Sequence, residues 1–260
     1  MQTGTGLFAF YPAYSGIASL AAGTKKPGTV GNYPPQPHTR TGKSAILVAF
    51  MNYLAHAVFS FGQPGLLVGN MISDFVKGRQ QYSYPPAIYA GIKLHRLIDA
   101  YTDGHPANQA ARALFRPHYR LYAASVVDVV YDYFVANDAA LFADTDALSR
   151  FAQATYTTLH QHEVLLPHGF ARMLPFMERQ NWLLNYRYTW GIGRSLEGLV
   201  HRSRHLTDAQ MAFTLFEQHQ GLLQDCYQQY RPALQQLLHR WWQAYSASGQ
   251  PPEPTALLTT

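Results

Sequence analysis

Histidine and aspartate recur at helical spacing in two apolar segments of this 260-residue chain. His95, Asp99 and Asp103 stand at i, i+4 and i+8 among leucines and isoleucines, so a helix would carry all three on one face. Asp128 and Asp132 repeat the i, i+4 spacing within a run of valines and aromatic residues. Carboxylates that share an apolar helix face repel each other and are costly to bury unpaired, and a bound cation relieves both costs. The spacing therefore predicts a metal centre.

The kind of acid supports this interpretation. Glu163 is the first glutamate of the chain, whereas eight aspartates lie between residues 74 and 146. Solvated helix faces normally use Glu, because the short Asp side chain competes for the helix backbone. His56 and Asp74 also interrupt apolar runs. We therefore expect five metal ligands, namely His56, Asp74, His95, Asp99 and Asp128.

Such a ligand set has a limited choice of ions and chemistry. Histidine nitrogens with several carboxylate oxygens suit Mn²⁺, Mg²⁺, Fe²⁺ or Zn²⁺. The absence of a cysteine cluster argues against a structural zinc site. The mixture is typical of a hydrolytic site, in which a metal polarises a phosphoryl oxygen and activates water. Beside the metal, we expect Asp103 or Asp132 to move protons and Arg96 to stabilise phosphate charge.

Several of these residues also have an ordinary structural interpretation. A single buried histidine such as His56 is often only a hydrogen-bonded core residue. Asp103 precedes a glycine and could belong to the turn that ends its helix. Ion pairs with arginine could account for the acids in the apolar runs. The candidate pairs are Asp128 or Asp132 with Arg96, Arg116 or Arg120.

The elements that must position these side chains are helices. Apolar residues recur at helical spacing from residue 51 to about 245, and no run alternates as a half-buried strand would. We expect helices over 51–60, 66–76, 86–102, 106–117, 120–141 and 145–162, the last capped by Thr145 or Asp146. Shorter helices should follow between 167 and 199, then one capped by Thr207, and Pro232 should start or kink the last. The pattern predicts an all-α fold with one compact multi-helix domain over 46–246.

Composition sets the limits of this domain and of its partners. Residues 1–45 and 247–260 are rich in Gly and Pro, which predicts a disordered extension and a disordered tail. The net charge of +5 falls to about +1 without residues 1–50, so charge does not indicate a nucleic-acid surface. The lone Cys226 excludes an internal disulfide and fits the cytoplasm. The uncharged stretch 44–73 is interrupted by a Gly-Gln-Pro-Gly turn, which favours two short buried helices over stable membrane insertion.

At these residues the chain resembles the acyl carrier protein phosphodiesterases, also called holo-acyl-carrier-protein hydrolases. The resemblance covers roughly residues 51–245. Its motifs are Met51-Asn52-Tyr53-Leu54-Ala55-His56, Gly69-Asn70 with Ser73-Asp74-Phe75, His95-Arg96-Leu97-Ile98-Asp99 with Thr102-Asp103, and Asp128 with Asp132, followed by Trp182-Leu183 and Tyr186.

The resemblance implies more than spacing alone. It implies an HD-like phosphohydrolase fold, a divalent metal such as Mn²⁺ and a phosphodiesterase reaction. Water would cleave the bond between 4′-phosphopantetheine and the serine of holo-acyl carrier protein. The chain departs from the HD pattern, since it has no adjacent His and Asp, and His95 with Asp99 is the substitute. Family members start at the equivalent of Met51, so residues 1–50 are an extension or follow a misplaced start codon.

Two other functions fit the same residues. A different metal phosphohydrolase, acting on a nucleotide or a small phosphodiester, would have the same centre. A non-catalytic helical module would use the metal or an ion-pair network only for stability. If the substrate is an acidic carrier protein, a basic patch should bind it. The candidate patches are Lys77, Arg79 and Lys93, or Arg194, Arg202 and Arg204. The oligomeric state is left open.

Overall fold

Helices make up the regular secondary structure of the residues that the structure describes, 53–203 and 205–258. In this computed structural model no β-strand occurs among those residues, so the all-α prediction is confirmed. The expected extension 1–45, together with Met51 and Asn52 of the first motif, lies outside the described residues. The α-helices are, in chain order, α1 (Tyr53–Val58), α2 (Pro64–Ile72), α3 (Pro86–Gly104), α4 (Pro106–Tyr119), α5 (Ala123–Ala136), α6 (Thr145–Gln161), α7 (His168–Arg179), α8 (Trp182–Asn185), α9 (Thr189–Arg202), α10 (Gln210–Gln218), α11 (Gln220–Ser248) and α12 (Pro254–Leu258).

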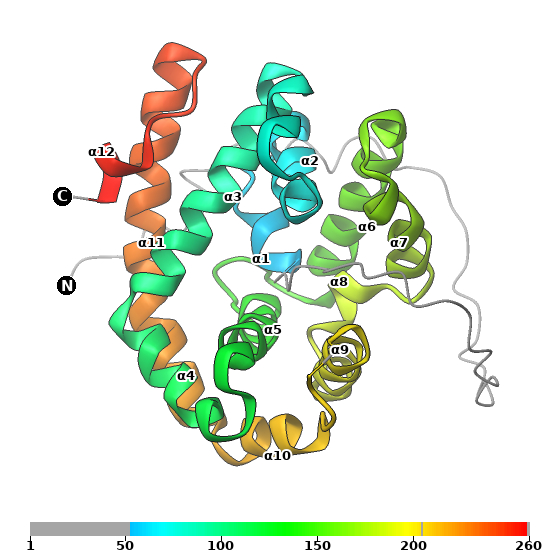
Figure 1. The fold of residues 1–260 in the computed structure, drawn as a ribbon, viewed down its shortest axis with the longest axis vertical. Helices are drawn as coiled ribbons and strands as arrows, with labels where there is room; N and C mark the ends of the chain where they lie inside the picture. Colours follow the sequence, from blue (N-terminus) through cyan, green and yellow to red (C-terminus); the bar gives the residue numbers. More distant parts are fainter. Residues whose placement is uncertain (1–52, 204, 259–260) are drawn as a thin grey trace.

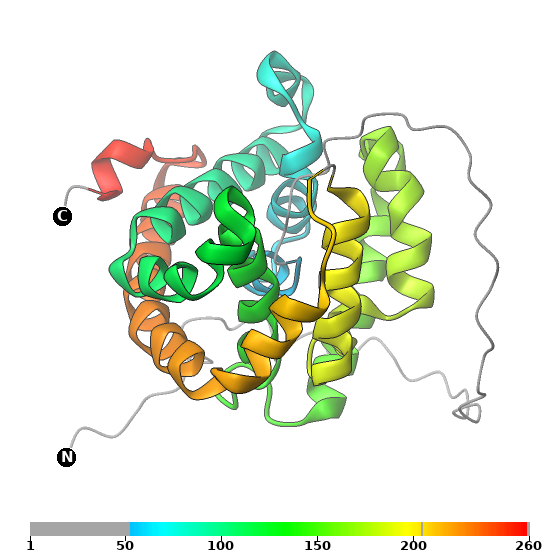
Figure 2. The same ribbon diagram turned by 60° about the horizontal axis from the view of Figure 1, so that its bottom comes forward.

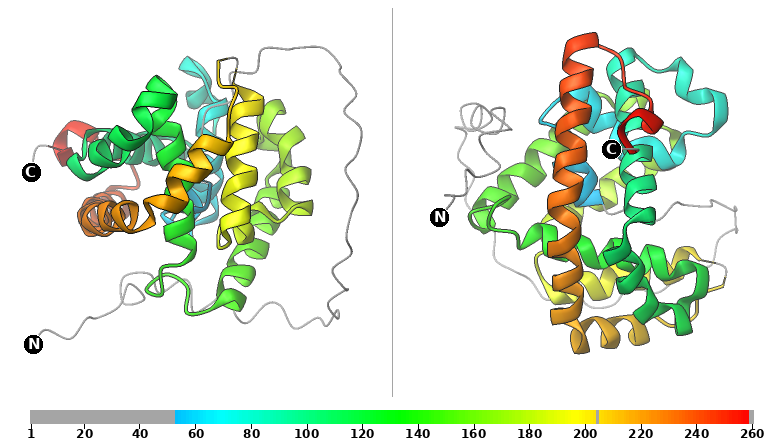
Figure 3. Two further views of the ribbon diagram at one scale, coloured as in Figure 1. Left: turned by 90° about the horizontal axis from the view of Figure 1, so that it is seen from below. Right: turned by 90° about the vertical axis from the view of Figure 1, so that its left-hand side faces the viewer.

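Helix α1 lies at the centre of the molecule, and the other helices surround it (Figure 1). All six of its residues are buried, and it packs against α2 and α5. Figure 2 shows α10 joining α9 to the long helix α11 at one end of the fold. In the right-hand view of Figure 3, α11 runs along almost the whole length of the molecule beside α3 and α4. The buried apolar side chains of these helices form one hydrophobic core cluster.

The uncharged stretch forms two short buried helices, as the sequence predicts. Helices α1 and α2 are separated by a turn in which Phe61 and Gly62 have positive φ. Pro64 then begins α2, where its missing N–H has no helical partner to lose. In the described part of the chain, no helix combines the length and the apolar character that a membrane crossing requires.

Helices α2 and α3 approach each other through two glycines. A Cβ atom on Gly69 would lie 2.0 Å from the carbonyl oxygen of Ile88. A Cβ atom on Gly91 would lie 2.3 Å from the carbonyl oxygen of Leu66. Real side chains do not occupy such distances, so the two backbones can be this close only because both positions are glycine. This contact sets the distance between the residues that follow Gly69 and those that follow Gly91.

Some local predictions differ from the structure. Asp144, rather than Thr145 or Asp146, caps α6, because its carboxylate accepts the N–H of Ala147 at 2.7 Å. Of the two roles predicted for Pro232, starting a helix is wrong, because it lies inside α11. The region expected as a tail contains α12, held by Leu257, which is buried and whose carbonyl accepts a hydrogen bond from Arg240. The predicted helix over 120–141 is a short 3-10 turn (Arg120–Tyr122) followed by α5, since Arg120 has positive φ.

Replacing Gly69 by Ala should destabilise the fold. The added methyl group meets backbone atoms of α3 that cannot rotate away, and overpacking of this kind costs about 1–3 kcal/mol. Thermal unfolding measures the effect. Gly104→Ala is the matched control, because nothing lies within 4 Å of its added Cβ. Equal melting temperatures for the two variants would show that α2 and α3 do not depend on this contact.

Candidate metal centre

His56 is held in one orientation by Asn70. The His56 Nδ1 atom lies 2.7 Å from Asn70 Oδ1. The amide nitrogen of Asn70 donates to the His56 carbonyl at 2.8 Å and to Ser60 Oγ at 3.1 Å, so its oxygen is the acceptor. The hydrogen-bond network therefore assigns the proton of the neutral His56 ring to Nδ1. Its Nε2 atom is left with a free lone pair.

His95 is oriented by the same residue. Its Nδ1 atom lies 2.8 Å from the Asn70 backbone carbonyl, which can only accept, so Nδ1 donates. The close glycine contact between α2 and α3 brings this carbonyl within reach of α3. The two imidazole rings stack with centroids 4.0 Å apart and an angle of 19° between their planes. Both rings therefore present Nε2 in the same direction.

Asp99 faces the Nε2 atoms of both rings. One of its oxygens lies 3.2 Å from His56 Nε2, and the other lies 3.0 Å from His95 Nε2. Both Nε2 atoms are buried and make no hydrogen bond of good geometry to the residues that the structure describes. Ligand atoms of His56, His95 and Asp99 lie within 4.8 Å of one another, so this group could hold a metal ion. Two buried ring nitrogens that converge with a carboxylate are a donor set that suits a divalent ion once the nitrogens are unprotonated.

Asp74 lies beside this group. It belongs to a short 3-10 helix (Ser73–Phe75) that directly follows α2, and its Oδ1 is 3.4 Å from His95 Nε2. The Asp74 side chain is 18% exposed, whereas that of Asp99 is 49% exposed. The centre is therefore closed by the histidines on one side and accessible to solvent at Asp99.

The charges of these residues are strongly coupled. Burial lowers the pKa of His95, but Asp99 and Asp74 outweigh it and raise the pKa to about 10. Burial and the neighbouring His95 lower the pKa of His56. Burial alone would raise the pKa of Asp99, yet His95 and His56 hold it well below the usual range. Without metal, His95 therefore carries a proton between two carboxylates, in the place where a cation would lie.

The two aspartates of α5 have different surroundings. Asp128 is half-buried, and burial together with the charge of Asp99 raises its pKa, while Arg112 opposes the rise. Asp132 is fully buried and accepts the N–H groups of Leu54 at 3.2 Å and Ala55 at 2.9 Å. Asp132 thus caps the first turn of α1 from another helix, which favours a structural role for it.

The remaining predicted residues also have partners in the fold. Asp103 is exposed and forms an ion pair with Arg112. Arg96 donates to Gln81 Oε1 at 2.6 Å and to the Val76 carbonyl at 3.2 Å. The ion pairs considered for Asp128 and Asp132 with Arg96, Arg116 or Arg120 do not occur among the described residues.

Sequence reasoning missed the role of Asn70. Asn70 lies outside the His and Asp pattern and occurs only in the Gly69-Asn70 motif of the resemblance, although its side chain and carbonyl orient both histidines. A sequence signal was present, since Asn is a poor residue for a buried helix interior unless its amide is fully hydrogen-bonded.

The fold and the site define a helical protein with a candidate metal centre of histidine and carboxylate ligands. Comparisons with known proteins then define its family. A family model described as acyl carrier protein phosphodiesterase matches residues 51–234. The acyl carrier protein phosphodiesterase of Photorhabdus laumondii is 31% identical over 182 residues, which are 70% of this chain and 92% of that protein. The protein of the same name from Serratia proteamaculans is 32% identical over 186 residues, covering 72% and 96%. The chain belongs to the acyl carrier protein phosphodiesterase family.

No solved structure shows a significant match to this chain. The helical class is established by the structure, whereas the HD-like arrangement stays a prediction.

Asp99→Asn should abolish tight binding of Mn²⁺. The amide keeps the size of the side chain but removes the negative charge that faces both ring nitrogens, so affinity should fall at least about tenfold. Isothermal titration calorimetry with Mn²⁺ measures it. Asp103→Asn is the control, since Asp103 is an aspartate of the same helix that pairs with Arg112 instead. An equal loss of affinity in both variants would contradict the placement of the centre.

Metal binding should release a proton and become tighter as pH rises. His95 has a raised pKa of about 10, so at neutral pH its Nε2 must lose a proton before it can bind a cation. Apparent affinity should therefore increase up to about tenfold per pH unit between about pH 6 and pH 8. Calorimetry in two buffers of different ionisation enthalpy counts the protons released. A count of zero would show that His95 does not lose a proton when the cation binds.

Proposed function

We propose that this protein hydrolyses the phosphodiester that joins 4′-phosphopantetheine to the serine of holo-acyl carrier protein, giving apo-carrier protein. The observation that carries the proposal is the convergence of His56 Nε2, His95 Nε2 and Asp99 in a chain of this family. The relatives named above carry the name acyl carrier protein phosphodiesterase, which supports the choice of substrate.

The proposed cofactor is Mn²⁺, with Mg²⁺ and Fe²⁺ as alternatives. His56, His95 and Asp99 would hold it, and Asp74 and Asp128 are the neighbouring carboxylates proposed to complete the set. When bound, such an ion polarises a phosphoryl oxygen and lowers the pKa of water.

The residues of the chain have separable tasks in this proposal. Asn70 keeps both histidines in the tautomer that frees Nε2. Asp99, which is half exposed, faces the side from which a protein-borne phosphodiester can approach. Arg96 is bound to Gln81 and Val76, so its proposed contact with phosphate requires a rearrangement of those hydrogen bonds. Asp103 stays the proposed proton carrier, because both oxygens of Asp132 already accept α1 N–H groups.

The proposed compartment is the cytoplasm, where a free thiol such as Cys226 stays reduced.

The test is incubation of holo-acyl carrier protein with the purified chain and Mn²⁺, read by intact mass. We expect the carrier protein to lose the mass of 4′-phosphopantetheine minus water. Asp99→Ala and Asp128→Ala should reduce turnover at least about 100-fold while the far-ultraviolet circular dichroism stays unchanged. Phosphate release from nucleotides without any loss of mass from holo-carrier protein would instead favour a different phosphohydrolase.

Carrier protein binding should depend on salt. Lys77 and Arg79 are exposed, and they follow the 3-10 helix that carries Asp74, so a basic patch adjoins the centre. Attraction between exposed charges is screened at high ionic strength. Raising salt should therefore increase KM more than it lowers kcat, measured by steady-state mass assays. Equal KM values at low and high salt would argue against docking through this patch.

A further inference from the structure

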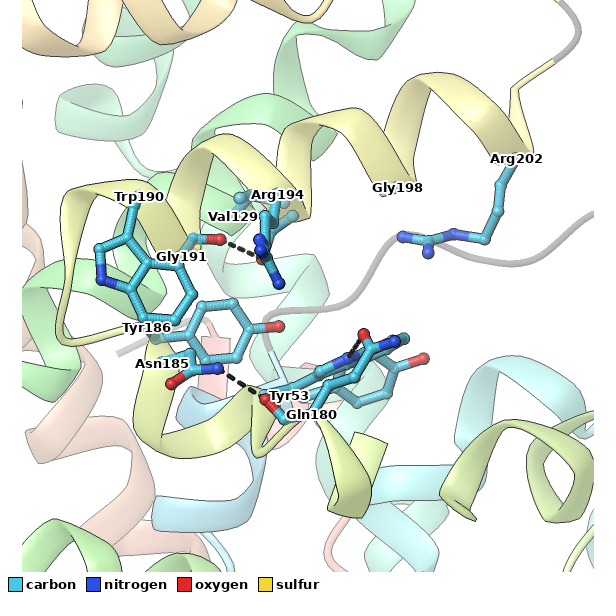
Figure 4. Close-up of a pocket in the computed structure, with 12 residues that line it drawn as sticks. Tyr53, Val129, Gln180, Asn185, Tyr186, Trp190, Gly191, Arg194, Gly198 and Arg202 are labelled. Atoms are coloured by element: carbon cyan, nitrogen blue, oxygen red, sulfur yellow. Dashed lines mark hydrogen bonds between the residues drawn. The ribbon is translucent and has the colours of Figure 1, made fainter. Parts of the chain in front are cut away.

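A pocket of about 160 Å³ lies between α1, α5, α8 and α9 (Figure 4). Four aromatic side chains line it, and α9 adds two arginines. These residues are Tyr53, Trp182, Tyr186, Trp190, Arg194 and Arg202. Its two arginines belong to the second basic patch predicted from the sequence, and the metal centre described above does not include any residue of this pocket.

The charge of the pocket is positive and unbalanced. Its lining contains Arg194 and Arg202 and no carboxylate. The guanidinium of Arg194 lies 5.4 Å from the centroid of the Trp190 ring. Arg202 makes no hydrogen bond or ion pair with any residue that the structure describes, and its Nε atom is buried. A buried donor without a partner is costly, so an anionic ligand would supply what Arg202 lacks.

The walls favour an aliphatic chain with amide groups. Trp190 is 48% exposed, so part of its ring is accessible to the apolar portion of a ligand in the pocket. The side-chain amides of Gln180 and Asn185 also line the pocket. Their accessible polar atoms can exchange hydrogen bonds with a ligand. Gly198 lies directly beside the Arg202 guanidinium, since a Cβ there would approach Nη1 of Arg202 to 3.0 Å.

Tyr53 connects the pocket to the metal centre. It lies three residues before His56 on α1, and it packs at 6.3 Å from the Trp182 ring. Burial raises the pKa of its hydroxyl; the charge of Arg202 opposes the rise and that of Asp74 adds to it. The Tyr53 hydroxyl therefore interacts electrostatically with Arg202 of the pocket and with Asp74 of the metal centre.

We propose that this pocket binds the 4′-phosphopantetheine arm of the substrate, with Arg202 as a positioning residue for the phosphate and the aromatic rings against the aliphatic chain. The proposal rests on the proposed function. Figure 4 shows Arg202 reaching from the end of α9 toward the space above Tyr53.

Direct binding of free 4′-phosphopantetheine to the Mn²⁺-loaded protein tests the proposal, read by tryptophan fluorescence and calorimetry. Arg202→Met should raise Kd about tenfold or more, because a hydrogen bond to a charged group is lost. Gly198→Leu should raise Kd similarly by filling the pocket without removing a charge. The control Arg150→Met, an exposed residue of α6, should leave Kd within about twofold. Pantetheine without its phosphate should not distinguish Arg202→Met from wild type.

The outcomes separate this proposal from the function on which it rests. If the protein cleaves holo-carrier protein and all variants bind 4′-phosphopantetheine alike, the pocket assignment is wrong and the function stands. If Arg202→Met raises only KM for the carrier protein, Arg202 contacts the carrier protein and the pocket assignment is also overturned. If no cleavage occurs but 4′-phosphopantetheine binds through Arg202, the function falls and the pocket assignment stands.

Discussion

Asn70 is the residue on which the geometry of the centre depends. Its side chain accepts from His56 Nδ1 and its backbone carbonyl accepts from His95 Nδ1, so one residue sets the tautomer and the direction of two rings on different helices. Its amide nitrogen is satisfied by the His56 carbonyl and by Ser60, which leaves the amide no alternative orientation. Without these bonds, two imidazole rings in contact would have no reason to direct both Nε2 atoms at the same carboxylate.

Two features of the fold hold these residues in place: the close approach of α2 to α3, and the support that α5 gives to α1. Gly69 and Gly91 allow α2 to lie against α3, which brings the Asn70 carbonyl within 2.8 Å of His95. Helix α1 has only six residues and is too short to be stable alone. Asp132 compensates by accepting two N–H groups in its first turn, so a residue of α5 fixes the element that carries both His56 and Tyr53. The metal centre and the arginine-lined pocket therefore share one support.

The fold class and part of the centre could be predicted from spacing. The i, i+4 relation of His95 and Asp99 placed them on one face of α3, and they face each other at 3.0 Å. Asp128 and Asp132 have the same spacing, yet one lies near Asp99 and the other caps α1. Periodicity cannot separate these roles, because both require an aspartate inside an apolar helix and differ only in what packs opposite. The role of Asn70 could not be predicted for a similar reason, since its hydrogen bonds reach His56 and His95, which are 14 and 25 positions away in the sequence. The arginine-lined pocket depends on contacts between four helices and has no local signature.

The claim that one ion lies among His56, His95 and Asp99 is tested most directly by anomalous diffraction from crystals grown with Mn²⁺. Data collected on both sides of the manganese absorption edge locate the ion independently of any assumption about ligands. We expect a peak within bonding distance of both Nε2 atoms and of an Asp99 oxygen. A peak that lies elsewhere, for example at the exposed pair of Asp103 and Arg112, or no peak in a protein that binds Mn²⁺ in solution, would contradict it.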